Sequence, residues 1–236
     1  MLFAAGKGTR LRPLTDHTPK CLVQAGGKTL LEHNIAYLKS NGVDSIVINT
    51  HHHADQVHDF LQARDFGLEI FISHENELLE TGGGLLKARA YFEDEPSFVV
   101  CNSDIYTDFD LKPLISAHHA SQNLATLVVS KRETSRYLRF NASMLLCGWE
   151  DRKTAKVLSW SDERFETWAF NGIQMMSPGM IDLMKDRGEK FSTIPVYLDA
   201  AERGERVAAY PMSDAFWIDI GTKDKLDALN SHLQAE

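Results

Sequence analysis

The chain opens on the stretch MLFAAGKGTRLRPLT, residues 1–15, and reaches Pro19-Lys20 shortly afterwards. Residues 1–5 are apolar, which predicts a short strand. The loop that follows contains two glycines and three basic side chains, Lys7, Arg10 and Arg12. Glycines let successive backbone N–H groups turn toward one point, and basic side chains beside them suit a polyphosphate. The stretch therefore predicts a strand followed by a phosphate-binding loop.

This loop differs from two common phosphate-binding motifs. Pro13 excludes a long helix directly after Gly8. The spacing fits neither the P-loop pattern G-x-x-x-x-G-K-[ST] nor the dinucleotide-binding pattern G-x-G-x-x-G. A plain glycine turn with solvated cations is the structural alternative, but turn chemistry alone requires neither the arginine nor the lysine.

Composition restricts the class of protein. A chain of 236 residues with 43% hydrophobic and 25% charged residues is typical of one globular domain. Its net charge of −8 argues against broad electrostatic binding to nucleic acid or to a membrane surface. The three cysteines are far apart and show no zinc or disulfide spacing. We therefore expect a cytoplasmic protein that binds neither nucleic acid nor membrane.

Apolar segments of strand and helix type alternate through the first half of the chain. Strands are expected at 45–49, 68–72, 98–101 and 124–129, and helices at 29–40, 54–64, 85–92 and 111–120. This order predicts an α/β fold with a mostly parallel sheet covered by helices on both faces.

The pattern changes after Ser130. Polar and apolar residues alternate between Tyr137 and Trp168, which predicts antiparallel strands. Further helices are expected at 178–186, 193–202 and 223–233, and a last strand at 216–218.

Asp104 follows the apolar strand at 98–101. Ligands of open parallel sheets lie beyond the carboxyl ends of the strands, and a carboxylate there can hold Mg²⁺ together with phosphates and water. A turn or helix-capping aspartate is the structural alternative. The adjacent histidines His51, His52 and His53 do not predict a metal site, because neighbouring residues on one element do not converge on one ion.

Several stretches together resemble the sugar-phosphate nucleotidylyltransferases. The pattern G-x-G-T-R-L-x-P-L-T followed by P-K resembles the signature of that family. The stretch LETGGG at 79–84 resembles the base-reading loop of N-acetylmuramate 1-phosphate uridylyltransferases, and WIDIGT at 217–222 resembles the second metal motif. Residues 170–173, FNGI, resemble the sugar-binding element. Two departures stand out: Ser103 replaces a usual glycine, and a His-His segment is missing between residues 130 and 165.

The resemblance implies a Rossmann-like, mostly parallel but mixed sheet flanked by helices, with a small antiparallel lobe on the acceptor side. It implies a single nucleotidyltransferase domain over 1–236. Within it, 1–130 would be the nucleotide-binding part, and 131–236 the sugar-phosphate-binding part with the C-terminal helix.

The resemblance also implies roles for individual residues. Arg10, Lys20 and Asp104 would be catalytic, and Asp104 and Asp219 would hold Mg²⁺. Sugar-phosphate contacts would come from Lys20, Asn171 and Gly172. Nucleotide contacts are expected from Ala4, Ala5, Gly6, Gly8, Thr9, Arg10, Thr81, Gly82, Gly83 and Asn102. In particular, the N–H groups of Gly82 and Gly83 would meet a base carbonyl.

The implied reaction transfers a nucleotidyl group from a nucleoside triphosphate to a sugar 1-phosphate and releases pyrophosphate. The glycine loop favours UTP and N-acetylmuramate 1-phosphate. Guanylyl transfer to mannose or heptose 1-phosphate is the alternative, since both activities share these motifs. A non-catalytic nucleotide-sugar-binding domain, and a glycosyltransferase that uses Asp108-Phe109-Asp110, are more distant alternatives. The base, the sugar and the choice between monomer and homodimer stay open.

Overall fold

The computed structural model describes residues 1–161 and 164–235. The chain forms two compact units that interleave along the sequence. The first unit contains 1–80, 101–110 and 215–236, and the second contains 81–100 and 111–214. Each unit has its own strands, helices and core.

The first unit is built on a parallel sheet. The short strand β1 (Leu2–Phe3) lies between two parallel neighbours, with Leu2 opposite Ile48 on one side and Cys101 on the other. The strands are β1, β4 (Ser45–Thr50), β5 (Glu69–His74) and the last two residues of β6 (Phe98–Asn102). Leu2, Ile48 and Cys101 are fully buried, as expected for parallel strands covered on both faces.

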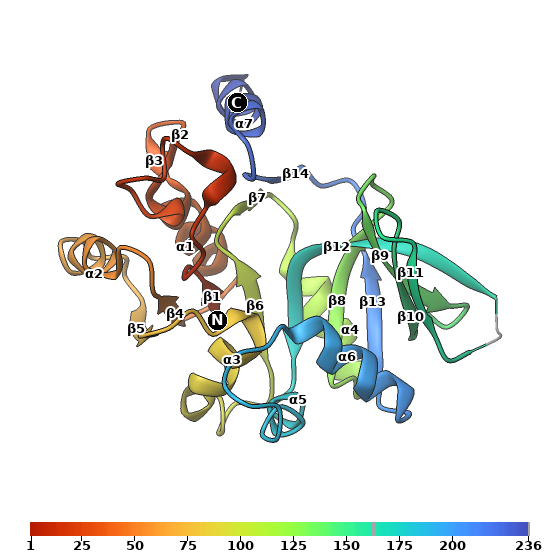
Figure 1. The fold of residues 1–236 in the computed structure, drawn as a ribbon. Coiled ribbons are helices and arrows are strands. Elements are labelled where there is room, and N and C mark those ends of the chain that lie inside the picture. The colour runs from red at the N-terminus through yellow and green to blue at the C-terminus, as the bar shows by residue number, and fades with distance from the viewer. Residues whose placement is uncertain (162–163, 236) are drawn as a thin grey trace. The chain divides into compact units, whose positions relative to one another are not determined.

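Two helices flank this sheet, α1 (Leu30–Ser40) and α2 (Ala54–Gln62) (Figure 1). Helix α1 begins with a capping box, in which the Thr29 side chain accepts from the Glu32 N–H and the Glu32 carboxylate accepts from the Thr29 N–H. This box satisfies two of the donors that a helix start leaves unpaired, and explains why the helix begins at Leu30.

The C-terminal segment joins the first unit through a hydrophobic cluster. Strand β14 (Trp217–Asp219) pairs antiparallel with β7 (Ile105–Thr107), and helix α7 (Lys223–Ala235) follows. A hairpin formed by β2 (Gln24–Ala25) and β3 (Lys28–Thr29) adds to the unit. The cluster consists of Leu11, Val23, Ala25, Leu30, Ile220, Leu226 and Leu229. Burial of these side chains holds the residues after Asp219 against those after the opening loop.

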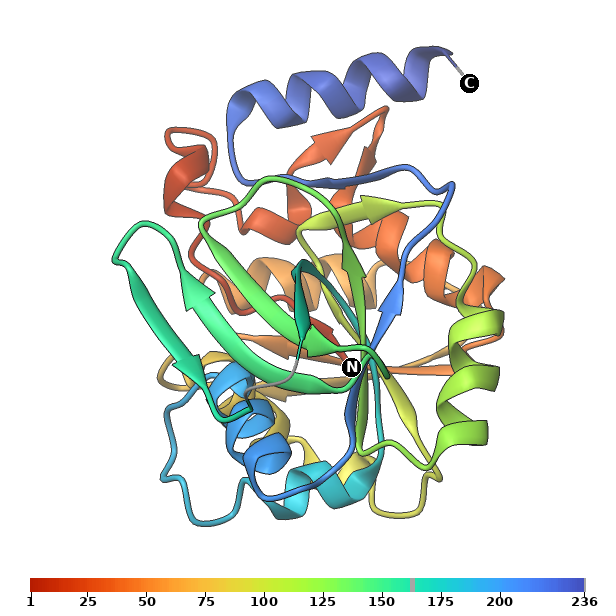
Figure 2. The ribbon, with the colours of Figure 1, turned by 90° about the vertical axis from the view of Figure 1, so that its right-hand side faces the viewer.

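The second unit contains a mixed sheet with helices on two sides. Strand β8 (Ala125–Ser130) pairs in parallel with β13 (Val207–Pro211) and antiparallel with β12 (Phe165–Met176). Figures 1 and 2 show α4 (Leu111–Ser121) and α6 (Thr193–Glu202) on opposite sides of these strands. The remaining helical segments are α3 (Glu80–Lys87), the 3-10 turn Arg89–Tyr91 and α5 (Pro178–Asp182).

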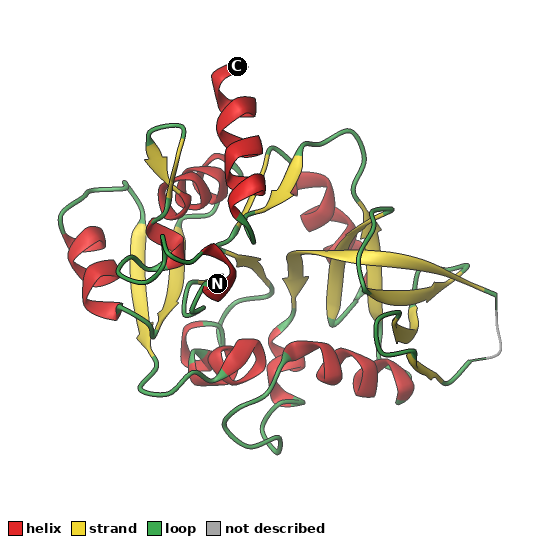
Figure 3. Ribbon diagram, turned by 45° about the horizontal axis from the view of Figure 1, so that its top comes forward, coloured by secondary structure: helices red, strands yellow, loops and turns green. Residues whose placement is uncertain are grey.

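The antiparallel strands predicted after Ser130 are present. Strand β9 (Arg136–Asn141) lies between β12 and β10 (Leu146–Asp151), and β10 also pairs with β11 (Lys156–Ser159). Figure 3 shows this part of the chain as strands joined by loops. The register between β12 and β8 shifts after Phe170, where Gly172 has a φ of 76° that favours glycine.

Some predicted elements differ from the observed ones. The glycines 82–84 were expected before a helix that begins at Leu85, but they lie inside α3. Residues 85–92 do not form one helix, because a 3-10 turn follows α3. Helix α5 ends at Asp182 rather than Asp186. Strands β7 and β13 were not predicted, since each is too short for its alternation to be recognised. The predicted α/β class, with a mixed sheet flanked by helices and a small antiparallel part, is confirmed.

Candidate active site

The opening loop is held against Lys20 by close packing. Gly8 has a φ of 62°, and a Cβ at this position would lie 3.0 Å from both Lys20 Cβ and Thr15 Cγ2. The Thr15 hydroxyl donates to the Gly8 carbonyl oxygen at 2.8 Å. A side chain at position 8 would therefore be strained and crowded. This packing brings Lys20 directly against the glycine loop.

Lys20 forms an ion pair with Asp104. Its ammonium group donates to Asp104 Oδ2, and the two side chains are 13% and 29% exposed. Asp104 follows β6, so its carboxylate stands at the carboxyl end of a parallel strand. The structure thus brings together two residues that the sequence predicted as catalytic although 84 positions separate them.

Asp219 lies beside Asp104 through the pairing of β14 with β7. Asp219 is directly opposite Ile105, and the Ile220 N–H donates to the Asp104 carbonyl oxygen at 2.6 Å. The carboxylate of Asp219 accepts from the ammonium group of Lys225, a residue that no motif singled out. Lys225 comes from the first turns of α7, so its place became visible only in the fold.

The two aspartates provide a donor set that suits Mg²⁺. Asp104 Oδ1 and Asp219 Oδ2 have no hydrogen-bond partner among the residues that the structure describes. Carboxylate oxygens are hard ligands, and Mg²⁺ commonly takes one or two of them together with phosphates and water. No group of three or more His, Cys, Asp or Glu side chains arranged to hold a metal is found within 1–161 and 164–235. The pair fits an ion that shares its coordination with substrate.

The basic side chains of the opening loop differ in their surroundings. A Cβ at Gly221 would lie 3.0 Å from both terminal nitrogens of Arg10, so the guanidinium group rests against the backbone that follows Asp219. Arg10 and Lys7 are exposed and form no ion pair with the described residues. Arg12, in contrast, pairs with Asp16 at 3.2 Å. Arg10 is therefore available to an anion beside the aspartates.

A buried polar network ties the ends of three parallel strands together. The Ala4 N–H donates to Asn49 Oδ1 at 2.7 Å, and Asn49 Nδ2 donates to Glu75 Oε1 at 2.7 Å. The second carboxylate oxygen of Glu75 accepts from the Leu79 N–H at 3.0 Å. Asn49 and Glu75 are almost completely buried. These residues were missed in the sequence, where an isolated Asn and Glu carry no signal, yet they position the start of the predicted nucleotide loop.

The predicted base-reading glycines are engaged inside the second unit. The N–H groups of Gly82 and Gly83 donate to the Phe191 carbonyl oxygen at 2.8 and 3.2 Å. A Cβ at Gly82 would lie 2.3 Å from the Phe191 ring. Thr81 Oγ1 accepts from the Thr193 N–H at 3.0 Å. The expectation that these N–H groups face a base carbonyl is therefore wrong for this structure: Gly82 is needed for close packing with Phe191.

The predicted sugar element lies on β12. Asn171 is 1% exposed, and its Oδ1 accepts from the Ser130 hydroxyl at 2.9 Å and from Arg132 Nε at 3.2 Å. Gly172 is buried at the register shift. The side chain of Asn171 is therefore buried and hydrogen-bonded to Ser130 and Arg132 within the second unit.

The histidines, the Asp108–Asp110 stretch and the cysteines are accounted for by contacts or by burial within the protein. His51 Nδ1 contacts the Glu75 carbonyl oxygen, whereas His53 contacts that of Asp16, so these two rings do not converge. Asp108 Oδ1 accepts a hydrogen bond from the Phe216 N–H at 2.7 Å, so this side chain of the Asp108–Asp110 stretch fixes the backbone at Phe216. Burial raises the pKa of the Cys21 and Cys101 thiols to about 12, which leaves both unreactive at neutral pH.

With this geometry in view, the comparisons with known proteins define the class. A model of the nucleotidyl transfer family, described as "Nucleotidyl transferase", matches residues 1–236. The chain belongs to this family. The family agrees with the one that the opening motif resembled.

One relative is named mannose-1-phosphate guanylyltransferase catalytic subunit beta, from Drosophila pseudoobscura pseudoobscura. It is 31% identical over 242 residues, which cover 100% of this chain and 62% of the relative. The chain spans about three fifths of the length of the curated relatives that it matches.

Two solved structures share the fold. HddC from Yersinia pseudotuberculosis, complexed with GMP-PN, has a TM-score of 0.77 and 23% identity, and the match covers 98% of this chain and 97% of HddC. The inositol-1-phosphate CTP transferase from T. maritima has a TM-score of 0.78 and 20% identity, with 99% and 94% covered.

No helix among the described residues is both long and apolar enough to span a bilayer.

Proposed function

We propose that this protein transfers a nucleotidyl group from a nucleoside triphosphate to a sugar 1-phosphate, giving a nucleotide sugar and pyrophosphate. The observation that carries the proposal is the arrangement of Lys20, Asp104 and Asp219 at the end of the parallel sheet of the first unit. The family match over the whole chain supports it. An enzyme of this kind needs no general base, because the attacking phosphate oxygen is already anionic.

Each of these side chains has a part in the reaction. The Lys20 ammonium group would hold the α-phosphate and the sugar phosphate together against their mutual repulsion. The Arg10 guanidinium group would hold the leaving pyrophosphate through paired hydrogen bonds. Asp104 and Asp219 would hold Mg²⁺, which when bound supplies further neutralisation of the phosphate charge. Breaking of the Lys20–Asp104 ion pair would free the Lys20 ammonium group to bind phosphate and the Asp104 carboxylate to bind Mg²⁺.

The relatives favour guanylyl transfer, with mannose 1-phosphate as the acceptor that their names give, over the uridylyl transfer that the glycine loop suggested. Relatives with 28–31% identity over nearly the whole chain carry mannose-1-phosphate guanylyltransferase in their names. The titles of the proteins of similar fold name different nucleotides, including CTP and UDP, so the fold alone does not identify the base of the donor. The N–H groups of Gly82 and Gly83 donate to the Phe191 carbonyl oxygen, so the uridylyl assignment keeps only the resemblance of the LETGGG stretch in its favour. We therefore propose GTP as the donor.

A screen of pyrophosphate release tests the donor and the acceptor together. The four nucleoside triphosphates are each combined with mannose, heptose, glucose and N-acetylmuramate 1-phosphates at limiting Mg²⁺. We expect GTP to give the highest kcat/KM, with a GDP-sugar as the product. A product dominated by a UDP-sugar would reverse the choice of base, and no pyrophosphate release with any pair would overturn the reaction itself.

The metal assignment has its own variants. Asp104→Asn and Asp219→Asn should each fold and lose most of their Mg²⁺-dependent turnover, because each loses a charged ligand. Asp224→Asn, at an exposed position in the first turn of α7, is the matched control and should keep its activity. Mg²⁺ titration by calorimetry provides a second measurement. Near-normal turnover of either variant at limiting Mg²⁺ would remove that residue from the metal site.

A further inference from the structure

Gly221 lies two positions after Asp219, in the short segment that joins β14 to α7. It is buried, and its φ lies outside the left-handed region, so residues with a side chain could adopt the same backbone conformation. Gly8, in contrast, has a φ of 62° that favours glycine. The reason for a glycine at position 221 is therefore the space that a side chain would occupy.

The guanidinium group of Arg10 fills that space. A Cβ at position 221 would lie 3.0 Å from Nη1, 3.0 Å from Nη2 and 3.1 Å from Cζ of Arg10. Because these three distances are nearly equal, the Cβ position lies over the face of the planar guanidinium group rather than beyond its edge. The N–H donors of a guanidinium group lie in its plane, so this contact leaves them open.

Packing of the adjacent residues fixes the contact between Arg10 and Gly221. Leu11 and Ile220, their neighbours in sequence, belong to the same hydrophobic cluster and are 2% and 0% exposed. The Ile220 N–H also donates to the Asp104 carbonyl oxygen at 2.6 Å. All of these residues belong to the first unit. The two backbones are therefore held at a set separation, and the face of the guanidinium group lies between them.

The in-plane donors of Arg10 are not used by the protein. Arg10 forms no ion pair or hydrogen bond with the residues that the structure describes. The Asp219 carboxylate, two positions before Gly221, already accepts from the Lys225 ammonium group. The contact with Gly221 thus holds the guanidinium group in place without consuming the donors that would bind an anion.

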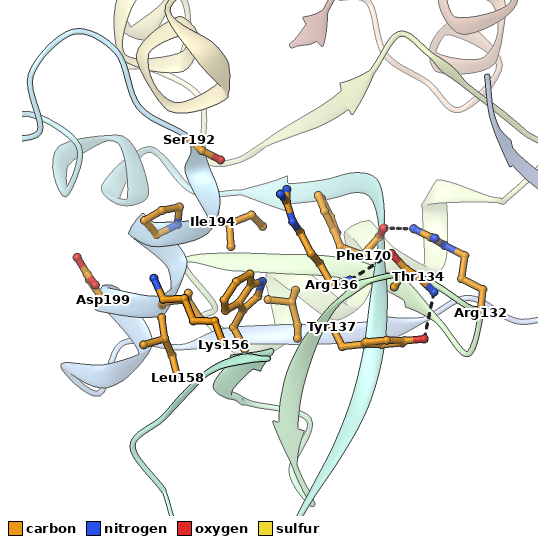
Figure 4. A pocket seen from close by; sticks show the side chains of 14 residues that line it. Arg132, Thr134, Arg136, Tyr137, Lys156, Leu158, Phe170, Ser192, Ile194 and Asp199 are labelled. Carbon is orange, nitrogen blue, oxygen red and sulfur yellow. Dashed lines mark hydrogen bonds between the residues drawn. The ribbon is translucent and has the colours of Figure 1, made fainter. Parts of the chain in front are cut away.

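Arg132 of the second unit shows the opposite arrangement. It lines a cavity of that unit, and Figure 4 shows its hydrogen bond to the Phe170 carbonyl oxygen, at 2.7 Å, as a dashed line. Its Nε donates to Asn171 Oδ1 at 3.2 Å. Arg132 is therefore held through its in-plane donors, whereas Arg10 is held through its face.

We propose that Gly221 is a positioning residue for Arg10, whose guanidinium group lies flat against it and directs its in-plane donors to the oxygens of pyrophosphate. The inference rests on the proposed function, which assigns the leaving pyrophosphate to Arg10. A Cβ at position 221 would displace the flexible end of Arg10 by a few tenths of an ångström and leave the backbone in place. A side chain there should therefore impair alignment more than stability.

Calorimetric titration with inorganic pyrophosphate at fixed Mg²⁺ tests this role without turnover. Gly221→Ala should weaken pyrophosphate binding by about three- to tenfold, since a misplacement of about 1 Å costs about 10²-fold and this displacement is smaller. Gly221→Val, with a larger side chain, should weaken it further. Urea denaturation should show near wild-type stability for Gly221→Ala.

Gly179→Ala is the matched control for crowding. A Cβ at Gly179 would lie 3.3 Å from Leu124 Cδ2, so the substitution is also tight, but Gly179 belongs to the second unit. We expect this variant to bind pyrophosphate with wild-type affinity. The Mg²⁺ affinity of Gly221→Ala should also equal that of the wild type, because the Asp219 carboxylate keeps its place.

A double-mutant cycle separates positioning from a general structural effect. Arg10→Ala alone should weaken pyrophosphate binding, and Gly221→Ala added to it should cause little further loss, because no guanidinium group remains to be displaced. A further loss as large as that of Gly221→Ala alone would overturn the inference. Wild-type pyrophosphate affinity in Gly221→Ala would overturn it as well.

Pyrophosphate release by the wild type separates failure of the inference from failure of the proposed function. If no pair of nucleoside triphosphate and sugar 1-phosphate supports release, the proposed function fails, and the inference fails with it. If the wild type is active and Arg10→Ala weakens pyrophosphate binding but Gly221→Ala does not, the proposed function stands and only the role of Gly221 is refuted.

Discussion

Lys20 and Lys225 of the first unit differ from Arg136 and Lys156 of the second unit in their ion pairs. In the first unit, Lys20 and Lys225 each lie on a carboxylate, Asp104 and Asp219, at the end of the parallel sheet. In the second unit, Arg136 pairs with Asp151 at 3.5 Å from a side chain that is 72% exposed, and Lys156 is exposed and forms no ion pair with the described residues. Groups that would bind phosphate and metal can neutralise one another until substrate arrives, whereas exposed cations such as Arg136 and Lys156 are screened mainly by solvent.

Gly6 of the first unit and Gly82 of the second differ in the space around them. In the first unit, a Cβ at Gly6 would meet nothing within 4 Å, so the loop leaves room beside its backbone. In the second unit, Gly82 lies against the Phe191 ring and carbonyl oxygen. The first glycine leaves space that a ligand can use, and the second is fixed by packing. Three predictions test this comparison, in order of expected effect.

Removal of Lys20 should have the largest effect. Loss of one charge-assisted phosphate contact costs about 2–4 kcal/mol in the transition state, or roughly 10²–10³ in kcat/KM. Lys20→Ala should show this loss, because it removes the ammonium group that pairs with Asp104 and that we propose to bind the α-phosphate and the sugar phosphate. The measurement is the steady-state rate of pyrophosphate release.

Arg12→Ala is the matched control for Lys20. Arg12 belongs to the same loop but is exposed and pairs with Asp16. We expect its kcat/KM to fall by less than about tenfold, since an exposed ion pair contributes little. Equal losses in the two variants would contradict the roles assigned here.

The same substitution at two glycines should have opposite consequences. Gly82→Ala places a methyl group 2.3 Å from the Phe191 ring, and overpacking of this kind destabilises a protein by about 1–3 kcal/mol. Gly6→Ala should leave the melting temperature unchanged and lower kcat/KM, because its methyl group occupies space beside the predicted phosphate loop. Urea denaturation of both variants gives the comparison. A stable Gly82→Ala protein would show that Phe191 can move.

A buried histidine should give the second unit a smaller, pH-dependent loss of stability. His118 is 2% exposed and contacts the hydroxyls of Thr126 at 2.8 Å and Ser177 at 3.1 Å. Burial, with a smaller contribution from the charge of His119, lowers the pKa of His118 from 6.5 to about 4. The unfolded chain therefore binds more protons below pH 6.5, so stability is present above that pH and is lost as the pH falls toward 4.

Between pH 7 and 5.5 this linkage should cost about 1 kcal/mol. His118→Gln removes the titrating group, so its free energy of unfolding should depend less on pH than that of the wild type. His119→Gln, at an exposed position on the same helix, should keep most of the dependence. Urea denaturation at both pH values measures the difference, and identical slopes for wild type and His118→Gln would exclude this histidine as the cause.

Much of the fold could be predicted from local patterns. Helix α1 was predicted from the helical spacing of its apolar residues, and β6 was recognised as buried because its residues are uniformly apolar. Such signals lie within a few residues of one another, so hydrophobic periodicity reveals them. Strands β7 and β13 carry no such signal, because their few residues become strands only by pairing with distant partners.

The division of the chain into units also depended on distant contacts. A division after residue 130 into nucleotide and sugar parts remains a proposal about function. The compact units divide the chain differently, since residues 215–236 belong with the first. Burial of Ile220, Leu226 and Leu229 with Leu11 holds them there, and no local pattern reveals such a long-range cluster.

The sequence by itself determined the motifs at the edge of the first unit's sheet: the glycine loop, Lys20, Asp104 and Asp219 were proposed for phosphate and metal because the stretches that contain them resemble those of the family. Only the tertiary structure decided what surrounds them. The pairing of Asp219 with Lys225, the Asn49–Glu75 network and the engagement of Gly82 by Phe191 join residues far apart in the chain. Arg136 and Lys156 likewise became neighbours of Asp151 only when β9 and β11 paired with β10. A motif can be recognised from residues that are close in sequence, whereas contacts between distant residues depend on packing and strand register.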